Sequence, residues 1–483
     1  MDFLPAPDYW LTRLVLELAL GAVYVVAFLV AANQFRPLLG ERGLLPVPQF
    51  LRHVSFLDAP SLFHLHYSDR ALLVVAWSGV ALGVAVVAGL PDVAPPWVAI
   101  PIWFALWVLY QSIVNVGQVF YGFGWETLLL EAGFLAIFLG AGATAPAWPL
   151  ILLFRWLLFR VEFGAGLIKL RGDRCWRDLT CLYYHHETQP MPNPLSWFFH
   201  HLPRPLHRIE VLGNFFAQLV VPFFLFAPQP VASVAGAVIA LTQAWLVLSG
   251  NFSWLNFLTM TLAISAFDDR ALSLVLPVDV PHLAPLPVWW QVLVVGVTVL
   301  VVVLSYRPLM NLISPRQLMN FSFDPFHLVN TYGAFGSVTK ERYEIVVEGT
   351  SDPSIGATGW RAYEFKGKPG DPHRVPRQFA PYHLRLDWLM WFAAFDTPFR
   401  HQWFIALMVR LLEADRPTLR LLRHDPFAGR RPAAVRATLH RYRYSSWADL
   451  RATGAWWVTS PAGDYLPPVV LDAAGNPARL GRE

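Results

Sequence analysis

Long stretches without charged residues dominate residues 1–306 of this chain. The longest runs from Val211 to Phe267 without any Asp, Glu, Lys or Arg, and further ones are Ala71–Leu90, Val93–Trp125 and Val280–Tyr306. A helix on the surface of a soluble domain needs polar residues on its solvated face. Each stretch is long enough for a membrane-spanning helix of about 20 apolar residues. The pattern predicts a polytopic α-helical membrane protein.

Nine candidate spans follow from these apolar runs. Two of them, Trp125–Leu139 and Phe252–Phe267, are short enough to be tilted or re-entrant, so we expect eight or nine spans. The other candidates are Leu11–Ala32, Ala71–Leu90, Trp97–Phe120, Pro149–Leu170, Ile209–Phe226, Val231–Leu248 and Pro287–Tyr306.

The pattern changes after Tyr306, where charges return and Gly and Pro interrupt shorter apolar runs. Alternation of apolar and polar residues predicts strands, and helical spacing predicts helices. Strands are expected at Tyr343–Glu348, Trp360–Phe365 and Val435–Tyr444, and helices at Leu384–Phe395 and His401–Ala414. We therefore predict a transmembrane bundle over 1–306, a linker over 307–320 and a C-terminal extramembrane α+β domain over 321–483.

Charge is scarce and dispersed. Only 14% of the 483 residues are charged, and the net charge of +4 is spread over loops and the C-terminal region. Without a basic block we expect no nucleic-acid partner. The two cysteines, Cys175 and Cys181, allow one disulfide, and free thiols are equally open.

The fifth predicted span carries charges that are costly inside a bilayer. Arg155, Glu162 and Lys169 are seven residues apart, so a helix places them on one stripe. They form either a structural ion-pair network or a polar intramembrane site, and both interpretations are open. The predicted network contains Glu126, Glu131, Arg155, Arg160, Glu162 and Lys169.

The loop after this span carries the most specific motif. It reads GAGLIKLRGD over 164–173, WRDLT over 176–180 and YYHHETQPMPNP over 183–194. This loop resembles that of the lipase maturation factor family, although His186 stands where we expect an aromatic residue. Further matching motifs occur in the same order, at Gly124–Glu126, Asn251–Asn256, Asn330–Gly333, Glu344–Gly349, Lys368–Asp371 and Arg385–Trp388.

The resemblance implies a membrane chaperone, without an enzymatic activity, that helps dimeric lipases to reach their active assembly in the endoplasmic reticulum. The short loops suggest a bacterial relative in the cytoplasmic membrane, with an exported lipase-like protein as its client. We expect the segment Asp173–Pro194 of the functional loop 171–208 to bind this client together with the C-terminal domain, and Arg155, Glu162 and Lys169 to hold the loop at the membrane surface. The loop residues expected to act are Asp173, Trp176, Arg177, Thr180, Tyr184, His185, His186, Glu187, Gln189, Pro190 and Asn193.

An intramembrane enzyme is the alternative. The segment Ala165–Leu170 is similar to one in the membrane domain of vitamin K-dependent carboxylase, and this similarity implies that Lys169 lies near the position of the carboxylase's base. In this interpretation Lys169 acts as a base on a lipid-soluble substrate, and membrane lipid is an expected partner in either case.

The histidines of loop 171–208 invite a metal-site interpretation with Glu187. The chain lacks the HExxH spacing, and Gln189-Pro190 interrupts any helix that could present several ligands on one face. We therefore predict no metal and no cofactor. The histidines considered are His185, His186, His200, His201 and His207.

Two indicators of membrane orientation disagree. Arginines near span ends concentrate in loops 33–70 and 171–208, which the positive-inside rule places in the cytoplasm. The family resemblance implies instead that the C-terminal domain lies on the exoplasmic side. We favour the exoplasmic side because these arginines belong to recognisable motifs.

Overall fold

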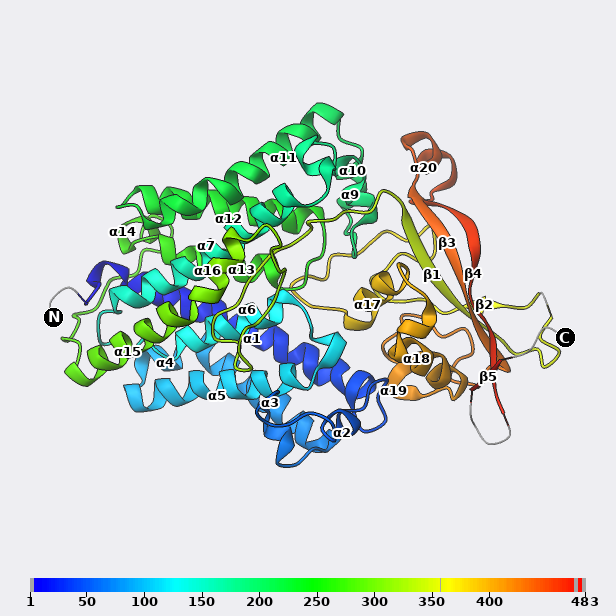
Figure 1. The fold of residues 1–483 in the computed structure, drawn as a ribbon, viewed down its shortest axis with the longest axis horizontal. Coiled ribbons are helices and arrows are strands. Elements are labelled where there is room, and N and C mark those ends of the chain that lie inside the picture. Colours follow the sequence, from blue (N-terminus) through cyan, green and yellow to red (C-terminus); the bar gives the residue numbers. More distant parts are fainter. Residues whose placement is uncertain (1–3, 357, 473–476, 480–483) are drawn as a thin grey trace.

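The computed structural model describes residues 4–356, 358–472 and 477–479 (Figure 1). The outer ends of the predicted domains 1–306 and 321–483 therefore lie outside the described residues. A bundle of helices forms one end of the molecule, and a sheet with its own helices forms the other. The segment between α16 and β1 runs along the bundle and connects the two.

The helical bundle begins with α1 and ends with α16, and its long helices run roughly parallel to the long axis of the molecule (Figure 1). The long and short helices of this part of the chain are η1 Pro7–Tyr9, α1 Trp10–Leu39, α2 Val47–Phe50, η2 Leu62–His64, α3 Asp69–Val87, α4 Leu90–Val93, α5 Pro96–Asn115, η3 Gln118–Phe120, α6 Gly124–Ala136, α7 Trp148–Arg171, α8 Arg174–Arg177, α9 Leu182–Thr188, α10 Ser196–His200, α11 Arg204–Leu219, η4 Val221–Phe226, α12 Val231–Ser249, α13 Leu255–Ala263, η5 Ile264–Ala266, α14 Asp269–Leu272, α15 Val288–Leu304 and α16 Tyr306–Ile313.

Six helical stretches of the described chain are long and apolar enough to cross a membrane. The helical membrane protein is thus supported, but the predicted eight or nine spans are not. The predicted fourth span is α6, with only 13 residues, and the predicted eighth is the short stretch Leu255–Ala266. The predicted fifth span is α7, which is long enough with 24 residues but carries too many charged residues to belong to the six apolar stretches. The six stretches are Pro7–Leu39, Asp69–Val87, Pro96–Asn115, Arg204–Phe226, Val231–Ser249 and Val288–Ile313.

Helices α1 and α3 pack closely because glycines of each helix leave room for larger side chains of the other. A Cβ atom at Gly79 would overlap the ring of Phe28, and one at Gly21 would overlap Val86. Small residues at such contacts let helix backbones approach where lipid removes the hydrophobic driving force. The side chain of Ser68 accepts a hydrogen bond from the Ala71 amide and caps the start of α3.

The C-terminal domain contains an antiparallel sheet of five strands in the order β2-β1-β3-β4-β5. The predicted strands at Tyr343–Glu348 and Val435–Tyr444 are confirmed, whereas the one at Trp360–Phe365 shrinks to two residues. The long strand β4 is absent from the sequence prediction, because Pro461, Pro467 and Pro468 interrupt its pattern. The strands are β1 Arg342–Thr350, β2 Arg361–Ala362, β3 Ala434–Tyr444, β4 Trp457–Leu471 and β5 Pro477–Arg479.

Helices of the C-terminal domain fill the space between the sheet and the bundle. Both predicted helices are present, as α17 and α18, and they lie on the bundle side of the sheet (Figure 1). Their buried side chains join those of β1, β3 and the bundle in one core. The helices are α17 Arg385–Ala393, η6 Pro398–Arg400, α18 Gln402–Leu412, α19 Arg416–Leu419 and α20 Trp447–Thr453.

Candidate functional site

The charged residues of α7 do not form one network. Arg155 lies near the N-terminal end of the helix and donates hydrogen bonds to the backbone oxygens of Leu225, Ser265 and Ala266 and to the Tyr9 hydroxyl. Its guanidinium also lies 5.1 Å from the ring centroid of Trp148. All these partners lie far from loop 171–208. The expectation that Arg155 holds this loop is therefore wrong, because carbonyl oxygens at helix ends satisfy its donors locally.

Arg160 and Glu131 form a buried ion pair between α7 and α6. Arg160 also donates to the backbone oxygen of Asn330 over 2.6 Å. The Oε2 atom of Glu131 accepts from the Asn330 backbone and side chain, both at 3.0 Å, and from Tyr332 Oη at 2.8 Å. This cluster therefore fastens segment 314–341 to the bundle.

Glu126, expected in the same intramembrane network, pairs instead with the C-terminal domain. Its Oε1 atom accepts from Arg385 Nη1 over 2.7 Å, and both side chains are fully buried. Tyr110 and Trp125 donate further hydrogen bonds to its carboxylate. The grouping of all six charges in one network is wrong, since α6 carries its two glutamates to different partners.

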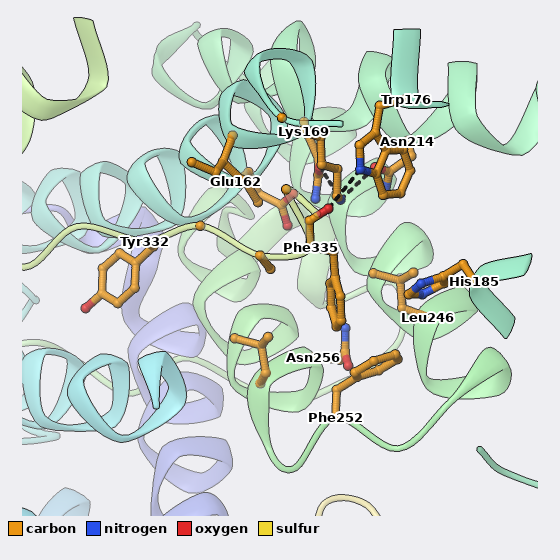
Figure 2. Close-up of a pocket in the computed structure, with 18 of the residues that line it drawn as sticks. Glu162, Lys169, Trp176, His185, Asn214, Leu246, Phe252, Asn256, Tyr332 and Phe335 are labelled. Carbon is orange, nitrogen blue, oxygen red and sulfur yellow. Dashed lines mark hydrogen bonds between the residues drawn. The ribbon is translucent and has the colours of Figure 1, made fainter. Parts of the chain in front are cut away.

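Glu162 and Lys169 line a large cavity at the end of the bundle that faces the C-terminal domain (Figure 2). Lys169 Nζ donates to Asn214 Oδ1 over 2.9 Å and to Gln218 Oε1 over 2.8 Å. Glu162 Oε1 accepts from Gln243 Nε2 over 2.6 Å. Each charged group is thus held by neutral amides of α11 or α12, which stabilise a charge without cancelling it.

The cavity has a volume of about 1030 Å³. Lys169, Trp176 and Asn214 lie together at one end, and Phe252 and Asn256 lie at the other (Figure 2). Most of the wall is apolar, and it comes from the bundle, loop 171–208, segment 314–341 and α17. Large apolar cavities with a few convergent polar groups are typical binding sites for small molecules.

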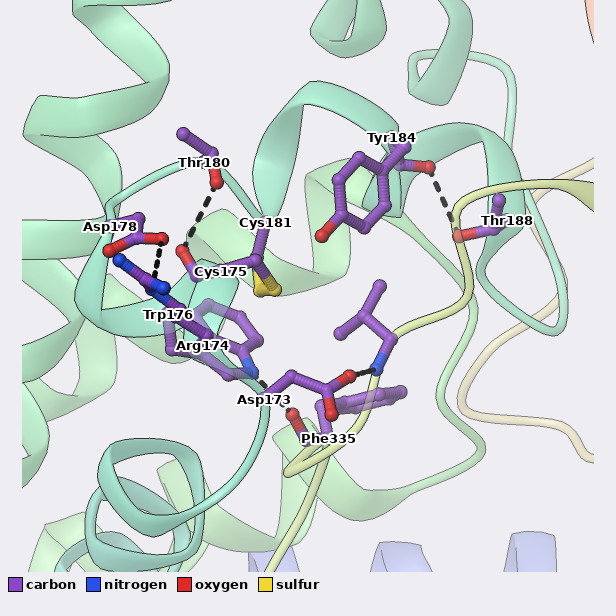
Figure 3. Close-up of a disulfide and its surroundings, with 11 residues drawn as sticks. Asp173, Arg174, Cys175, Trp176, Asp178, Thr180, Cys181, Tyr184, Thr188 and Phe335 are labelled. Carbon is purple, nitrogen blue, oxygen red and sulfur yellow. Dashed lines mark hydrogen bonds and ion pairs between the residues drawn. A yellow bond between two sulfur atoms is a disulfide. The ribbon is translucent and has the colours of Figure 1, made fainter.

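Loop 171–208 begins with a compact turn that a disulfide closes between Cys175 and Cys181 (Figure 3). Trp176 is buried beneath it, where its Nε1 donates to the backbone oxygen of Phe335 over 2.8 Å and Lys169 Nζ lies 5.4 Å from its ring centroid. Asp173 Oδ2 accepts from the Val338 amide over 2.8 Å. The turn is therefore fixed to both α7 and segment 314–341.

The middle of the loop is fixed to the sheet. Arg342, at the start of β1, donates to the backbone oxygens of Glu187, Gln189 and Pro190. The Oε2 atom of Glu187 accepts from the Tyr444 amide over 2.7 Å, although burial raises the pKa of Glu187. These bonds join the loop to β1 and β3.

The end of the loop is fixed to the C-terminal end of α12. Gln189 Nε2 donates to the Ser249 oxygen over 2.8 Å, and Asn193 Nδ2 donates to the oxygens of Val247 and Leu248 over 3.0 Å. Loop 171–208 therefore connects the bundle with the C-terminal domain.

Most of the loop residues expected to act are buried. Among them Arg177 is exposed, while Asp173, Thr180 and Tyr184 are half-buried. His185 faces the ring of Phe335 at 5.2 Å, and its burial, together with His186 and Lys169, lowers its pKa to about 3. The buried members of the set can support the loop from within, and they are Trp176, His185, His186, Glu187, Gln189, Pro190 and Asn193.

Several residues of the site were not found from the sequence. Arg342, Arg385, Asn330 and Phe335 make the contacts that join the parts of the molecule. Asn330 and Arg385 lie within motifs that carry the family resemblance. Sequence spacing could not name their partners, because those partners lie more than a hundred residues away.

Comparison with known proteins agrees with this architecture. The family model for the lipase maturation factor transmembrane domain matches residues 11–274, and that for the lipase maturation factor C-terminal domain matches residues 328–467. Human lipase maturation factor 1 is 45% identical, with 96% of this chain and 88% of the relative covered. Mouse lipase maturation factor 2 is 30% identical, with 93% of this chain and 82% of the relative covered.

No solved structure matches the chain. The relatives named above are animal proteins and lend no support to the predicted bacterial origin or to a link with the carboxylase. The two family models together match most of the chain, in the order that the sequence motifs predict. This chain therefore belongs to the lipase maturation factor family.

Proposed function

We propose that this protein is a membrane-embedded maturation factor that assists the folding and assembly of exported lipases. The names of its relatives support this function, and the match extends over both the membrane and the C-terminal domains. We also propose a division of the chain into a bundle over 1–306, a linker over 307–320 that contains most of α16, and a C-terminal domain over 321–483.

One surface feature carries the proposal. Phe198 of α10 and Trp447 of α20 are 42% and 50% exposed, and their ring centroids lie 5.9 Å apart. Leu195, 41% exposed, belongs to the same loop as Phe198, and Trp456 lies 6.3 Å from Phe198. We name Leu195, Phe198, Trp447 and Trp456 the junction patch, because loop 171–208 and the C-terminal domain both contribute to it.

The junction patch fits a protein client whose own assembly is incomplete. Such a client exposes apolar surface until its final contacts form. Exposed aromatic residues provide large contact areas and act as anchors at protein interfaces. The buried residues of loop 171–208 then have a positioning role, since they hold α10 against α20.

We further propose that this surface lies on the exoplasmic side of the membrane. The disulfide between Cys175 and Cys181 supports that side, because disulfides persist in oxidising compartments. Arg204 and Arg208 are among the arginines that suggest the opposite orientation. Both contact Tyr183, so their positions also have a structural reason within the protein. The membrane is that of the endoplasmic reticulum or, in a bacterium, the cytoplasmic membrane.

The cavity supports membrane lipid as a second partner. Its apolar wall fits an acyl chain, and Lys169, Asn214 and Gln218 can donate or accept hydrogen bonds at a headgroup. We propose that a bound lipid fills this space and supports the contact between the bundle and α17.

A co-expression assay tests the client function. We expect the double variant Phe198→Ser, Trp447→Ser to reduce the specific activity of a secreted lipase at least tenfold while the variant reaches the membrane in normal amount. The matched control is Leu274→Ser, an 86% exposed apolar residue just after α14 at the other end of the bundle (Figure 1). Equal lipase activity with the double variant and the wild type would reject the junction patch as the client surface.

A further inference from the structure

Three polar side chains from two helices converge at the edge of the cavity. His186 comes from α9, whereas His207 and Glu210 lie one turn apart on α11 and so share a face. Their ligand-type atoms all lie within 4.8 Å of one another. The Oε2 atom of Glu210 is 3.9 Å from both His186 Nε2 and His207 Nδ1.

These atoms are buried without hydrogen-bond partners in the part of the chain that the structure describes. His186 and His207 are only 1% and 2% exposed. Both ring nitrogens of His186, Nδ1 of His207 and Oε2 of Glu210 lack a hydrogen-bond partner, because the histidine–Glu210 contacts of 3.9 Å are too long for a hydrogen bond. A buried polar atom without a partner costs about 1–3 kcal/mol. Three such side chains that converge on one point are an arrangement typical of a ligand-binding site.

The surroundings orient two of the three side chains. His207 Nε2 lies 3.4 Å from the backbone oxygen of His200, a contact that favours the tautomer with the proton on Nε2. In this tautomer Nδ1 carries the lone pair that can bind a metal ion. The other oxygen of Glu210, Oε1, accepts from Trp245 Nε1 over 2.8 Å. Metal-binding histidines and carboxylates use the same arrangement, with the second polar atom of each ligand held by a neighbouring group.

We propose that His186, His207 and Glu210 bind a zinc ion. Two imidazole nitrogens and one carboxylate oxygen form a ligand set that suits Zn²⁺, whereas Mg²⁺ and Ca²⁺ prefer oxygen ligands alone. Tetrahedral zinc with bonds of about 2.0–2.1 Å separates its ligand atoms by about 3.3 Å. Zinc binding therefore requires side-chain rotations that draw the three atoms, which lie within 4.8 Å of one another, to that separation.

The zinc ion joins α9 of loop 171–208 to α11 of the bundle. His186 and Glu210 also line the cavity, so the fourth coordination position can face it and take a water molecule or a polar group of a cavity ligand. The prediction from sequence of no metal site considered only ligands within one helix or loop. It did not include Glu210, which lies in a predicted span.

Metal analysis of the full-length protein in detergent tests the site. The protein should carry a purification tag without histidine, and its zinc content should be measured after washing with a weak chelator. We expect about one zinc per chain in the wild type and a loss of at least tenfold in His186→Phe and in His207→Phe. The control His282→Gln changes an exposed histidine and should keep its zinc. Equal zinc content in the wild type and in both Phe variants would overturn the proposal.

Two further measurements on folded protein keep the test decisive. Co²⁺ added to the metal-free wild type should give the visible absorption of a tetrahedral site, and a spectrum of octahedral Co²⁺ would overturn the proposal. Trp245→Phe removes the bond to Glu210 but no ligand, and should weaken zinc affinity by about 10–100-fold. An unchanged affinity would contradict the role given to Trp245 and to Glu210.

Discussion

Arg385 of the C-terminal domain donates a hydrogen bond over 2.7 Å to Glu126 of the bundle, 259 residues earlier in the chain. Both side chains are fully buried. Arg385 also donates to the backbone oxygen of Phe120 over 2.7 Å and lies over the ring of Tyr121. This contact helps to fix the two domains in one arrangement, because either charge alone is costly to bury.

Replacing one partner of this pair should destabilise the protein strongly. Arg385→Met leaves the Glu126 carboxylate buried without its counter-charge, which costs about 3–5 kcal/mol. Denaturant unfolding of the detergent-purified protein measures the change. The double variant Arg385→Met, Glu126→Leu should recover part of the loss, and the exposed arginine Arg441 gives the control Arg441→Met, with no measurable effect. Equal stabilities of Arg385→Met and the control would show that the pair is unimportant.

Arg342 should control the order of loop 171–208. Arg342→Met removes the donors that bind the backbone oxygens of Glu187, Gln189 and Pro190. Hydrogen exchange in residues 182–194 should then become at least tenfold faster, since the loop loses its contact with β1. The exposed Lys340 nearby provides the control Lys340→Met, with unchanged exchange. Unchanged exchange in Arg342→Met would mean that other bonds fix the loop.

Trp176 should be required for client activation but not for membrane insertion. Trp176→Ala removes the ring beneath the disulfide turn and the bond to Phe335, so the loop no longer positions α10. We expect loss of lipase activation with a normal amount of protein in the membrane. Trp176→Phe keeps most of the ring and loses only the hydrogen bond, so it should retain more activity. Normal lipase activation by Trp176→Ala would contradict this positioning role.

The disulfide should be present in cells and should stabilise the loop. Cys175 and Cys181 are six residues apart, and the entropy model for so small a ring gives about 2 kcal/mol. Alkylation with a heavy maleimide should modify the protein only after reduction. Cys175→Ser, with one cysteine left, is the control that reacts without reduction. Wild-type protein that reacts before reduction would place the loop in a reducing compartment, against the exoplasmic orientation.

His327 should contribute to acid sensitivity. Its Nε2 lies 2.7 Å from Asn115 Oδ1, and burial lowers its pKa from 6.5 to about 4. The folded state therefore favours the neutral ring. This stability is complete above pH 6.5, where the unfolded ring is also neutral, and falls as the pH drops from 6.5 to about 4.

The loss from this group is on the order of 2–3 kcal/mol. Thermal unfolding of the wild type and of His327→Gln, compared between about pH 7.5 and about pH 4.5, measures this loss. The midpoint should fall less steeply in the variant. Parallel curves would show that His327 does not cause the pH dependence, since other buried groups titrate equally in both proteins.

The sequence alone determined the class of the protein and its family. A charge-free stretch such as 211–267 is stable only where water is absent, so its meaning does not depend on its neighbours. Strands β1 and β3 were also predictable, because alternation along a strand reflects the two faces of the sheet. The loop motif over 164–194 identifies the family from residue types and spacing alone.

Only the tertiary structure decided the partners. The spacing of Arg155, Glu162 and Lys169 predicts one stripe, yet Arg155 binds carbonyl oxygens while Lys169 binds amides of α11. His186 and Glu210 likewise meet only because α9 folds back onto α11. Local periodicity specifies which residues avoid water, but the partner of a buried polar group is set by helix packing and by long-range chain connections that a sequence pattern does not encode.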